Sequence, residues 1–178
     1  MNSFISIIKY KSPLGSLLIG SFEDKICLCD WEHRKMRAAI DDRIQRKIGF
    51  PYQYQNEAII EKTISQLEEY FARERTNFSI PISLIGTEFQ QRVWNELLAI
   101  EYGKTISYLE LANRLNQKLA IRAIATANGA NAISILIPCH RIIGSDGSFV
   151  GYAGGIPAKK KLLEIEGSNA QRELFDYQ

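Results

Sequence analysis

A cysteine and a histidine adjoin each other at the end of an apolar run, Ile-Leu-Ile-Pro-Cys-His-Arg, residues 135–141. Pro138 cannot donate to a strand ladder, so a buried strand would end there and present Cys139 at the wall of a pocket. A thiol is mostly protonated at neutral pH, and His140 could remove its proton to give the nucleophilic thiolate. Without such neighbours, a cysteine after an apolar run is most often a small buried hydrophobe.

The path of the proton and the partner of the histidine stay open at this point. Adjacent side chains in extended chain point to opposite faces, so His140 would need a turn or a bridging water to reach the thiol. A third group, usually an acid, should orient the imidazole. Glu164 and Glu166 both qualify, and their spacing does not select between them.

Helix-start signals precede the Cys-His pair and predict what would position it. Thr87 with Gln90 and Ser107 with Glu110 are both capping-box patterns. The second predicted helix is short and is followed by a polar turn. A small-residue helix over 120–128 then ends at Gly129, which gives a helix-turn-helix pattern.

The remaining elements predict an α+β chain of two domains. Residues 1–30 contain three short strands that predict an antiparallel meander, and residues 57–72 have helical periodicity. Residues 34–56 are charged and irregular, and we expect loop with some helix there. Beyond the helix-turn-helix we expect a short strand over 133–138, a glycine-rich loop and a helix over 158–166.

Composition narrows the class of protein. The 178 residues are 46% hydrophobic and 24% charged, and the net charge of +2 does not by itself predict nucleic-acid binding. No apolar stretch approaches the roughly 18 residues of a membrane span, and the N-terminus is unlike a signal peptide, so we expect a cytoplasmic chain with no membrane partner. The three cysteines should be thiols in a reducing compartment. Cys27, Cys29 and His33 lack a fourth ligand, so no metal site is expected.

Three stretches together resemble one family. "FQQRVWNELLAIEYGKTISYLELA", "ILIPCHRIIGSDGSFVGYAGG" and "KKKLLEIEG" are similar to the O6-alkylguanine-DNA alkyltransferases, also called methylated-DNA–protein-cysteine methyltransferases, in their stand-alone form. The resemblance is specific from about Phe89 to Gly167 and looser in the first 85 residues, where "SPLGSLLIG" carries it.

The resemblance implies a fold and a reaction. Residues 1–85 would form a ribonuclease-H-like domain with a small sheet and a helix, and 86–167 a mostly helical, winged-helix-like domain with the helix-turn-helix, followed by a tail over 168–178. The activity would be DNA repair by irreversible, single-turnover transfer of an alkyl group from O6-alkylguanine to Cys139 after base flipping. O4-alkylthymine stays open as a second substrate. No cofactor is implied, and the partner would be double-stranded DNA, bound by a monomer through its minor groove.

The family's site residues map onto matching positions. Cys139 would accept the alkyl group, His140 would take the thiol proton through a water, Glu166 would hold His140, and Asn131 would brace the site. Tyr108, Val150, Tyr152 and Ala153 would contact the alkylated base. Arg122 would enter the base stack in place of the flipped nucleotide. The further DNA contacts implied are Gln90, Ala123, Ala127, Asn128 and Gly129.

Two other functions compete with this interpretation. A thiol hydrolase could use Cys139 and His140, but it would leave the helix-turn-helix without a role. A non-catalytic lesion-binding protein is the second alternative. The alkyltransferase-like relatives that bind lesions without repairing them lack the acceptor cysteine, so the presence of Cys139 favours transfer.

Overall fold

The computed structural model describes residues 3–168 and divides into two compact units. The first unit contains Met1–Gly86 together with Ala132–Leu136, and the second contains Thr87–Asn131 together with Ile137–Gln178. The expected α+β class is confirmed, with an N-terminal sheet flanked by helices and a mostly helical remainder. The expected tail over 168–178 lies, after its first residue, outside the described part of the chain.

The first unit is built on a four-stranded sheet in the order β3-β2-β1-β4. The strands β1 (Ile5–Ser12), β2 (Gly15–Phe22) and β3 (Lys25–Trp31) pair antiparallel in sequence order, as the meander prediction required. The short β4 (Tyr52–Tyr54) adds parallel to β1. Its single parallel pairing makes the sheet mixed.

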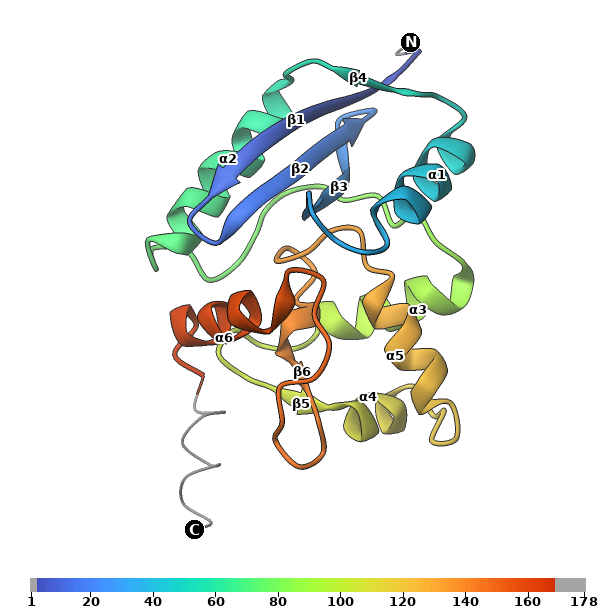
Figure 1. The fold of residues 1–178 in the computed structure, drawn as a ribbon, viewed down its shortest axis with the longest axis vertical. Helices are drawn as coiled ribbons and strands as arrows, with labels where there is room; N and C mark the ends of the chain where they lie inside the picture. Colours follow the sequence, from blue (N-terminus) through green and yellow to red (C-terminus); the bar gives the residue numbers. More distant parts are fainter. Residues whose placement is uncertain (1–2, 169–178) are drawn as a thin grey trace. The chain divides into compact units, whose positions relative to one another are not determined.

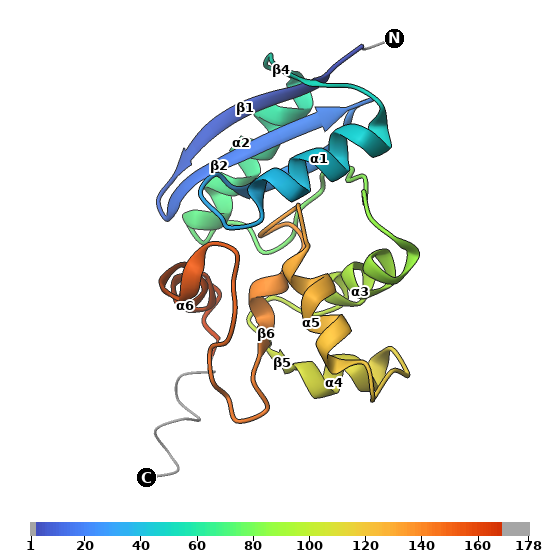
Figure 2. The same cartoon turned by 45° about the vertical axis from the view of Figure 1, so that its right-hand side comes forward.

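One helix covers each face of this sheet (Figures 1 and 2). The helix α2 (Ala58–Phe71) forms where helical periodicity predicts it. The helix α1 (Arg37–Ile48) forms within the charged segment over 34–56, where loop with some helix was expected. Ile40 and Ile44, one turn apart, are buried in the core, and Ile48 packs against the same cluster, so one apolar stripe docks an otherwise charged helix.

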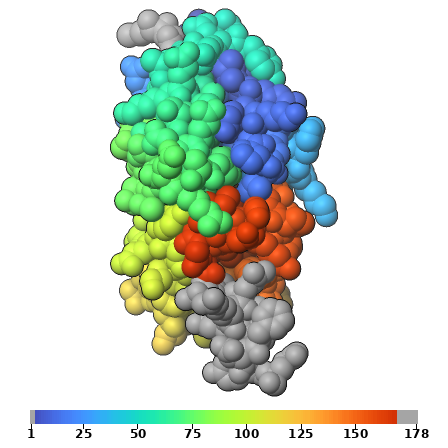
Figure 3. Space-filling model, turned by 90° about the vertical axis from the view of Figure 1, so that its left-hand side faces the viewer, coloured from blue at the N-terminus to red at the C-terminus, as the bar shows by residue number. Residues whose placement is uncertain are grey.

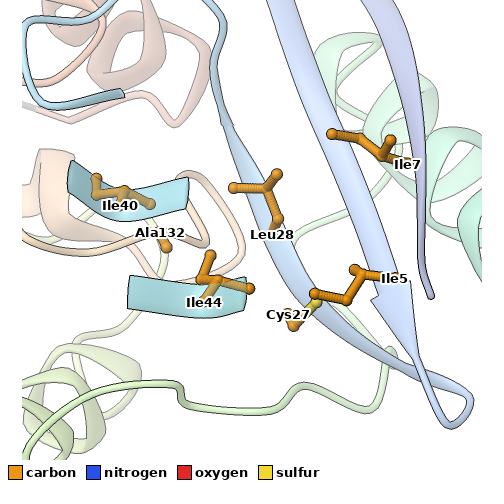
Figure 4. Close-up of a cluster of buried hydrophobic side chains, with 7 residues drawn as sticks. All are labelled: Ile5, Ile7, Cys27, Leu28, Ile40, Ile44 and Ala132. Atoms are coloured by element: carbon orange, nitrogen blue, oxygen red, sulfur yellow. The ribbon is translucent and has the colours of Figure 1, made fainter. Parts of the chain in front are cut away.

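The core beneath α1 draws residues from distant parts of the sequence, including one from the 132–136 segment (Figure 4). The backbone N–H of Cys29 donates to the carbonyl of Ala132 at 2.9 Å, so this segment runs along the outer edge of β3. The first unit therefore holds a piece of chain whose two ends continue into the second unit. The buried members of this cluster are Ile5, Ile7, Cys27, Leu28, Ile40, Ile44 and Ala132.

The second unit begins with α3 (Glu88–Leu98), which starts at a complete capping box between Thr87 and Gln90. The helices α4 (Tyr108–Arg114) and α5 (Ile121–Gly129) follow and pack on each other, which gives the predicted helix-turn-helix. Trp94 on α3 donates its indole N–H to the carbonyl of Ala127 on α5 at 2.8 Å. This bond fixes one turn of α5 against α3.

Two short strands and a last helix complete the unit. The strands β5 (Ile106–Ser107) and β6 (Ile142–Ile143) pair in parallel. The helix α6 runs over Gly155–Ile165, so it begins three residues before the expected start and includes the proline that was expected to open it. Side chains of α6 reach the surface in Figure 3, where they are coloured red to orange. No helix within residues 3–168 is long and apolar enough to cross a membrane.

Candidate active site

The cysteine of the Pro-Cys-His-Arg motif lies in a single turn of 3₁₀ helix, Cys139–Arg141. The backbone N–H of Arg141 donates to the carbonyl of Pro138 at 3.0 Å, and the chain then enters β6. Ile142 of β6 pairs with Ile106 of β5, and Tyr108 follows β5 directly. This small parallel ladder places the chain that follows the cysteine turn beside the strand that leads into α4.

The prediction of a strand over 133–138 was wrong. Only isolated bridge residues form there, at Ile133, Ser134 and Ile137, and Ile133 bridges to Cys29. The buried residue Ile135 has a φ of 74°, in the left-handed region that a β-branched residue rarely adopts, and Pro138 lacks the N–H that a ladder needs. Cys139 and His140 are consequently not in extended chain, and the 3₁₀ turn sets the relative direction of their side chains.

Asn131 ties the end of the helix-turn-helix to the cysteine. It is buried two residues after α5, and its Nδ2 donates to Cys139 Sγ at 3.2 Å and to the carbonyl of Ile137 at 3.1 Å. A donor on the sulfur favours the thiolate over the thiol. The amide thus restrains the backbone beside Cys139 and stabilises negative charge on its sulfur.

His140 is fully buried and is held by Glu166, not by Glu164. Its Nε2 lies 2.7 Å from Glu166 Oε1, whereas Glu164 is exposed and pairs with Lys161. The other ring nitrogen, Nδ1, is buried and has no hydrogen-bond partner among the described residues. With Nε2 committed to the carboxylate, Nδ1 is the nitrogen that can take up a proton.

Electrostatics keep Glu166 ionised and His140 neutral. Burial alone would raise the pKa of Glu166, but hydrogen bonds and charges from His140 and Arg141 outweigh it and lower that pKa to about 2. Arg141 donates to both carboxylate oxygens, at 2.9 and 3.1 Å, and the backbone N–H of Gly103 donates to Oε2 at 3.2 Å. Burial lowers the pKa of His140 despite the opposing effect of Glu166. A neutral imidazole on an ionised carboxylate is ready to act as a base.

Tyr108 presents a protonated phenol near the sulfur. Burial, and next the negative charge of Cys139, raise the pKa of Tyr108. Asn128 on α5 donates its Nδ2 to the phenol oxygen at 3.2 Å. Because that bond uses the oxygen as an acceptor, the phenol hydrogen stays available for donation to another group.

The glycine-rich loop is tied down by a buried lysine. Lys159 on α6 donates to the carbonyls of Ile142 and Val150, one at each end of the loop. Burial lowers the pKa of Lys159 to about 8, while the charge of Cys139 acts in the opposite direction. Tyr152 meets the imidazole of His140 edge to face, with ring centroids 6.3 Å apart, and Ala153 follows it in the loop. Tyr152, one of the loop residues expected at the alkylated base, therefore lies beside the histidine.

The residues of α5 expected at DNA fall into two groups. Arg122, Ala123 and Gly129 are exposed along one side of α5. Ala127 and Asn128 are buried, the first against α3 and the second beside Tyr108. Gln90 closes the capping box at the start of α3, and its side chain accepts from the backbone N–H of Thr87 at 3.0 Å.

Sequence reasoning missed three contributors to the site. Arg141 was visible only as part of the motif, and its pairing with Glu166 depends on tertiary contact. Lys159 could have been found, because it shares a helix face with Leu162 and Leu163 and so must be buried. At Gly103, with φ of 75°, a Cβ would come within 2.8 Å of the Glu166 carbonyl, so glycine is required for the close approach.

The cysteines of the first unit form no comparable site. Cys27 and Cys29 are buried in β3, and burial raises the pKa of Cys27 to about 12. The side chain of His33 is 87% exposed. Within residues 3–168, no group of three or more His, Cys, Asp or Glu is arranged to hold a metal ion.

Comparison with known families accounts for almost the whole described chain. Residues 5–84 match the "6-O-methylguanine DNA methyltransferase, ribonuclease-like domain", and residues 88–168 match the "6-O-methylguanine DNA methyltransferase, DNA binding domain". The two matches meet close to the division between the two units at Gly86.

Individual proteins and structures agree with this match. The chain is similar to the methylated-DNA–protein-cysteine methyltransferases of Methanosarcina acetivorans, at 36% identity over 89% of this chain and 96% of the relative, and of Haemophilus influenzae, at 40% identity over 88% and 83%. A crystal structure of Mycobacterium tuberculosis OGT in complex with DNA superimposes with a TM-score of 0.78 at 35% identity, covering 96% of this chain and 99% of that one.

Proposed function

The chain belongs to the 6-O-methylguanine DNA methyltransferase family, and we propose that Cys139 is the residue through which it acts. As a member, it binds DNA and repairs it by transferring an alkyl group from a damaged base to a cysteine. Three cysteines are present as free thiols. One cluster of contacts carries the assignment to Cys139. Asn131 donates a hydrogen bond to its sulfur, and the neighbouring His140 is a buried, neutral base held by an ionised carboxylate.

The proton of the thiol leaves first. His140 Nδ1 has no protein partner among the described residues, so a water between Nδ1 and Cys139 Sγ is the proposed path. The imidazolium that forms is stabilised by Glu166, which Arg141 holds in place. Asn131 stabilises the thiolate until it reacts.

The thiolate then displaces the purine in line. A sulfur–carbon bond forms to the alkyl carbon while the bond from that carbon to O6 breaks, and the electron pair leaves with the guanine. Tyr108, kept protonated by its raised pKa, donates a hydrogen bond to the departing ring. The proton lost by the thiol ends on the guanine. The thioether product is stable, so each molecule acts once.

The damaged base must leave the duplex before it can reach this sulfur, because guanine O6 lies inside the paired stack. The helix-turn-helix is proposed to approach the minor groove of double-stranded DNA through the exposed side of α5. Arg122 would fill the gap in the stack, and Ala123 and Gly129 would allow close approach. The active species is proposed to be a monomer in the cytoplasm, where a reducing environment keeps the acceptor thiol free.

Stoichiometry tests this function. A limiting amount of protein is incubated with excess duplex containing one O6-methylguanine, and restored guanine is counted. We expect a plateau at one lesion per protein molecule. The Cys139→Ala variant should restore none while still binding the duplex. Repeated turnover by the wild-type protein, or repair by Cys139→Ala, would contradict the assignment.

A further inference from the structure

The side-chain amide of Asn128 is only half satisfied. The residue is 5% exposed, and its Nδ2 donates to the Tyr108 hydroxyl. Its Oδ1 is buried and has no hydrogen-bond partner among the described residues. Buried polar atoms in folded proteins nearly always have partners, because an unmade bond leaves the full desolvation penalty. The amide oxygen is therefore open to a donor from a bound ligand.

The position of this oxygen is fixed by the fold. Asn128 lies on α5 directly after Ala127, whose carbonyl receives the indole N–H of Trp94. The hydroxyl of Tyr108 accepts a hydrogen bond from the amide nitrogen of Asn128, and the charge of Cys139 raises the pKa of that same phenol. The amide oxygen is therefore held beside the group that faces the departing base, within the same cluster as the acceptor sulfur.

Few groups on DNA can donate to such an oxygen. Phosphates and esterified deoxyribose carry no N–H or O–H. The minor-groove edges of A·T pairs present only acceptors, and the guanine 2-amino group is the single donor there. Alkylation at O6 removes the hydrogen from guanine N1, so the 2-amino group is the donor left on O6-alkylguanine. O4-alkylthymine has no N–H at all.

We propose that Asn128 Oδ1 accepts a hydrogen bond from the 2-amino group of the extruded O6-alkylguanine. The residue then acts as a specificity determinant that favours alkylated guanine over O4-alkylthymine. A site with an acceptor placed for this donor disfavours a base without it, because the amide oxygen would remain buried and unpaired. This inference rests on the proposed function, since it requires the damaged base to enter the site.

The test compares two lesions that differ only in the amino group. Single-turnover rates are measured on matched duplexes carrying O6-methylguanine or O6-methylhypoxanthine, which lacks the 2-amino group. The wild-type protein should react faster with O6-methylguanine. Asn128→Leu should lose about tenfold more rate on O6-methylguanine than on O6-methylhypoxanthine, the size expected for one buried hydrogen bond. Loss of the bond to Tyr108 slows both lesions alike and cancels in the ratio.

Controls keep the outcomes distinct. Asn113→Leu makes the same change at an exposed position on α4 and should leave the ratio of the two rates unchanged. Asn128→Ala provides a second truncation if the leucine variant fails to fold, as judged by thermal unfolding. An equal ratio of rates in wild-type protein and folded Asn128 variants would overturn the inference. Failure of the wild-type protein to demethylate either lesion would instead overturn the proposed function.

Discussion

The chemistry at residue scale depends on one carboxylate. Glu166 receives four donors, from His140, twice from Arg141, and from the Gly103 backbone. The bonds and charges of His140 and Arg141 hold its pKa at about 2 although it is buried. An acid held ionised can fix the tautomer of His140 and stabilise its protonated form. In the proposed mechanism, the reactivity of Cys139 thus depends on a group that does not touch the sulfur.

Removal of that charge gives a prediction for activity. Glu166→Gln should slow transfer about a hundredfold, the size of a general-base contribution. The transfer rate of the wild-type protein should be constant above pH 7. It should decrease only at pH values lower than the ordinary histidine pKa of about 6.5, because burial lowers the pKa of His140. Glu166 opposes that lowering, so the variant's acid limb should move to lower pH.

The matched control is Glu164→Gln, which removes an exposed carboxylate two residues away. Single-turnover rates across pH 5–9 on a methylated duplex measure both variants. Equal losses in the two variants, or an acid limb that shifts to higher pH in Glu166→Gln, would contradict the assigned role of Glu166.

At the scale of elements, α6 and the glycine-rich loop act together through Lys159. Lys159→Met removes the donor shared by the carbonyls of Ile142 and Val150. It should slow transfer about tenfold, since a small displacement of the loop residues that contact the damaged nucleobase can have such an effect. Lys161→Met changes an exposed lysine on the same helix and should have little effect. Hydrogen exchange over 144–154 should increase in the first variant only. Unchanged exchange there would argue against the tether.

The exposed side of α5 yields a prediction about duplex DNA. Arg122→Ala should slow repair of a methylated duplex about tenfold or more but barely alter reaction with free O6-benzylguanine, because only the duplex requires an extruded base. Arg114→Ala, at an exposed arginine on α4 that pairs with Glu110, is the control. Equal losses of rate on the two substrates would contradict the proposal that Arg122 fills the gap in the base stack.

The elements that sequence patterns predicted well are those with local signals. The box of Thr87 and Gln90 lies within one helical turn, and the meander follows from turn residues between apolar strands. The 133–138 run is as apolar as a strand, but a tertiary setting places Ile135 at positive φ and ends the ladder. Spacing did not separate Glu166 from Glu164, although the family resemblance did, because both lie near the end of one helix and only tertiary contact brings the buried one to His140.

At the scale of the whole molecule, the site contributes to stability. The folded pKa of Glu166, about 2, lies below its ordinary value of 4.5. The stabilisation is therefore complete above pH 4.5 and is lost as pH falls toward 2, and 2.5 pKa units correspond to about 3 kcal/mol. Urea unfolding should show Glu166→Gln to be less stable than the wild type at pH 7 by about this amount, with the difference shrinking in acid. A difference independent of pH would contradict the ion-pair origin.

The division of labour between the two units makes the location of the transferred group the central question. Cys27 and Cys29 lie in the first unit as buried thiols with raised pKa values, whereas Cys139 lies in the second unit among the groups proposed to activate it. The most direct measurement is the mass of the intact protein after incubation with a duplex containing one O6-methylguanine, followed by peptide mapping. The account predicts a gain of one methyl group per molecule, confined to the peptide with Cys139 and absent in Cys139→Ala. An unchanged mass with the lesion still present, or a methyl group on Cys27 or Cys29, would contradict it.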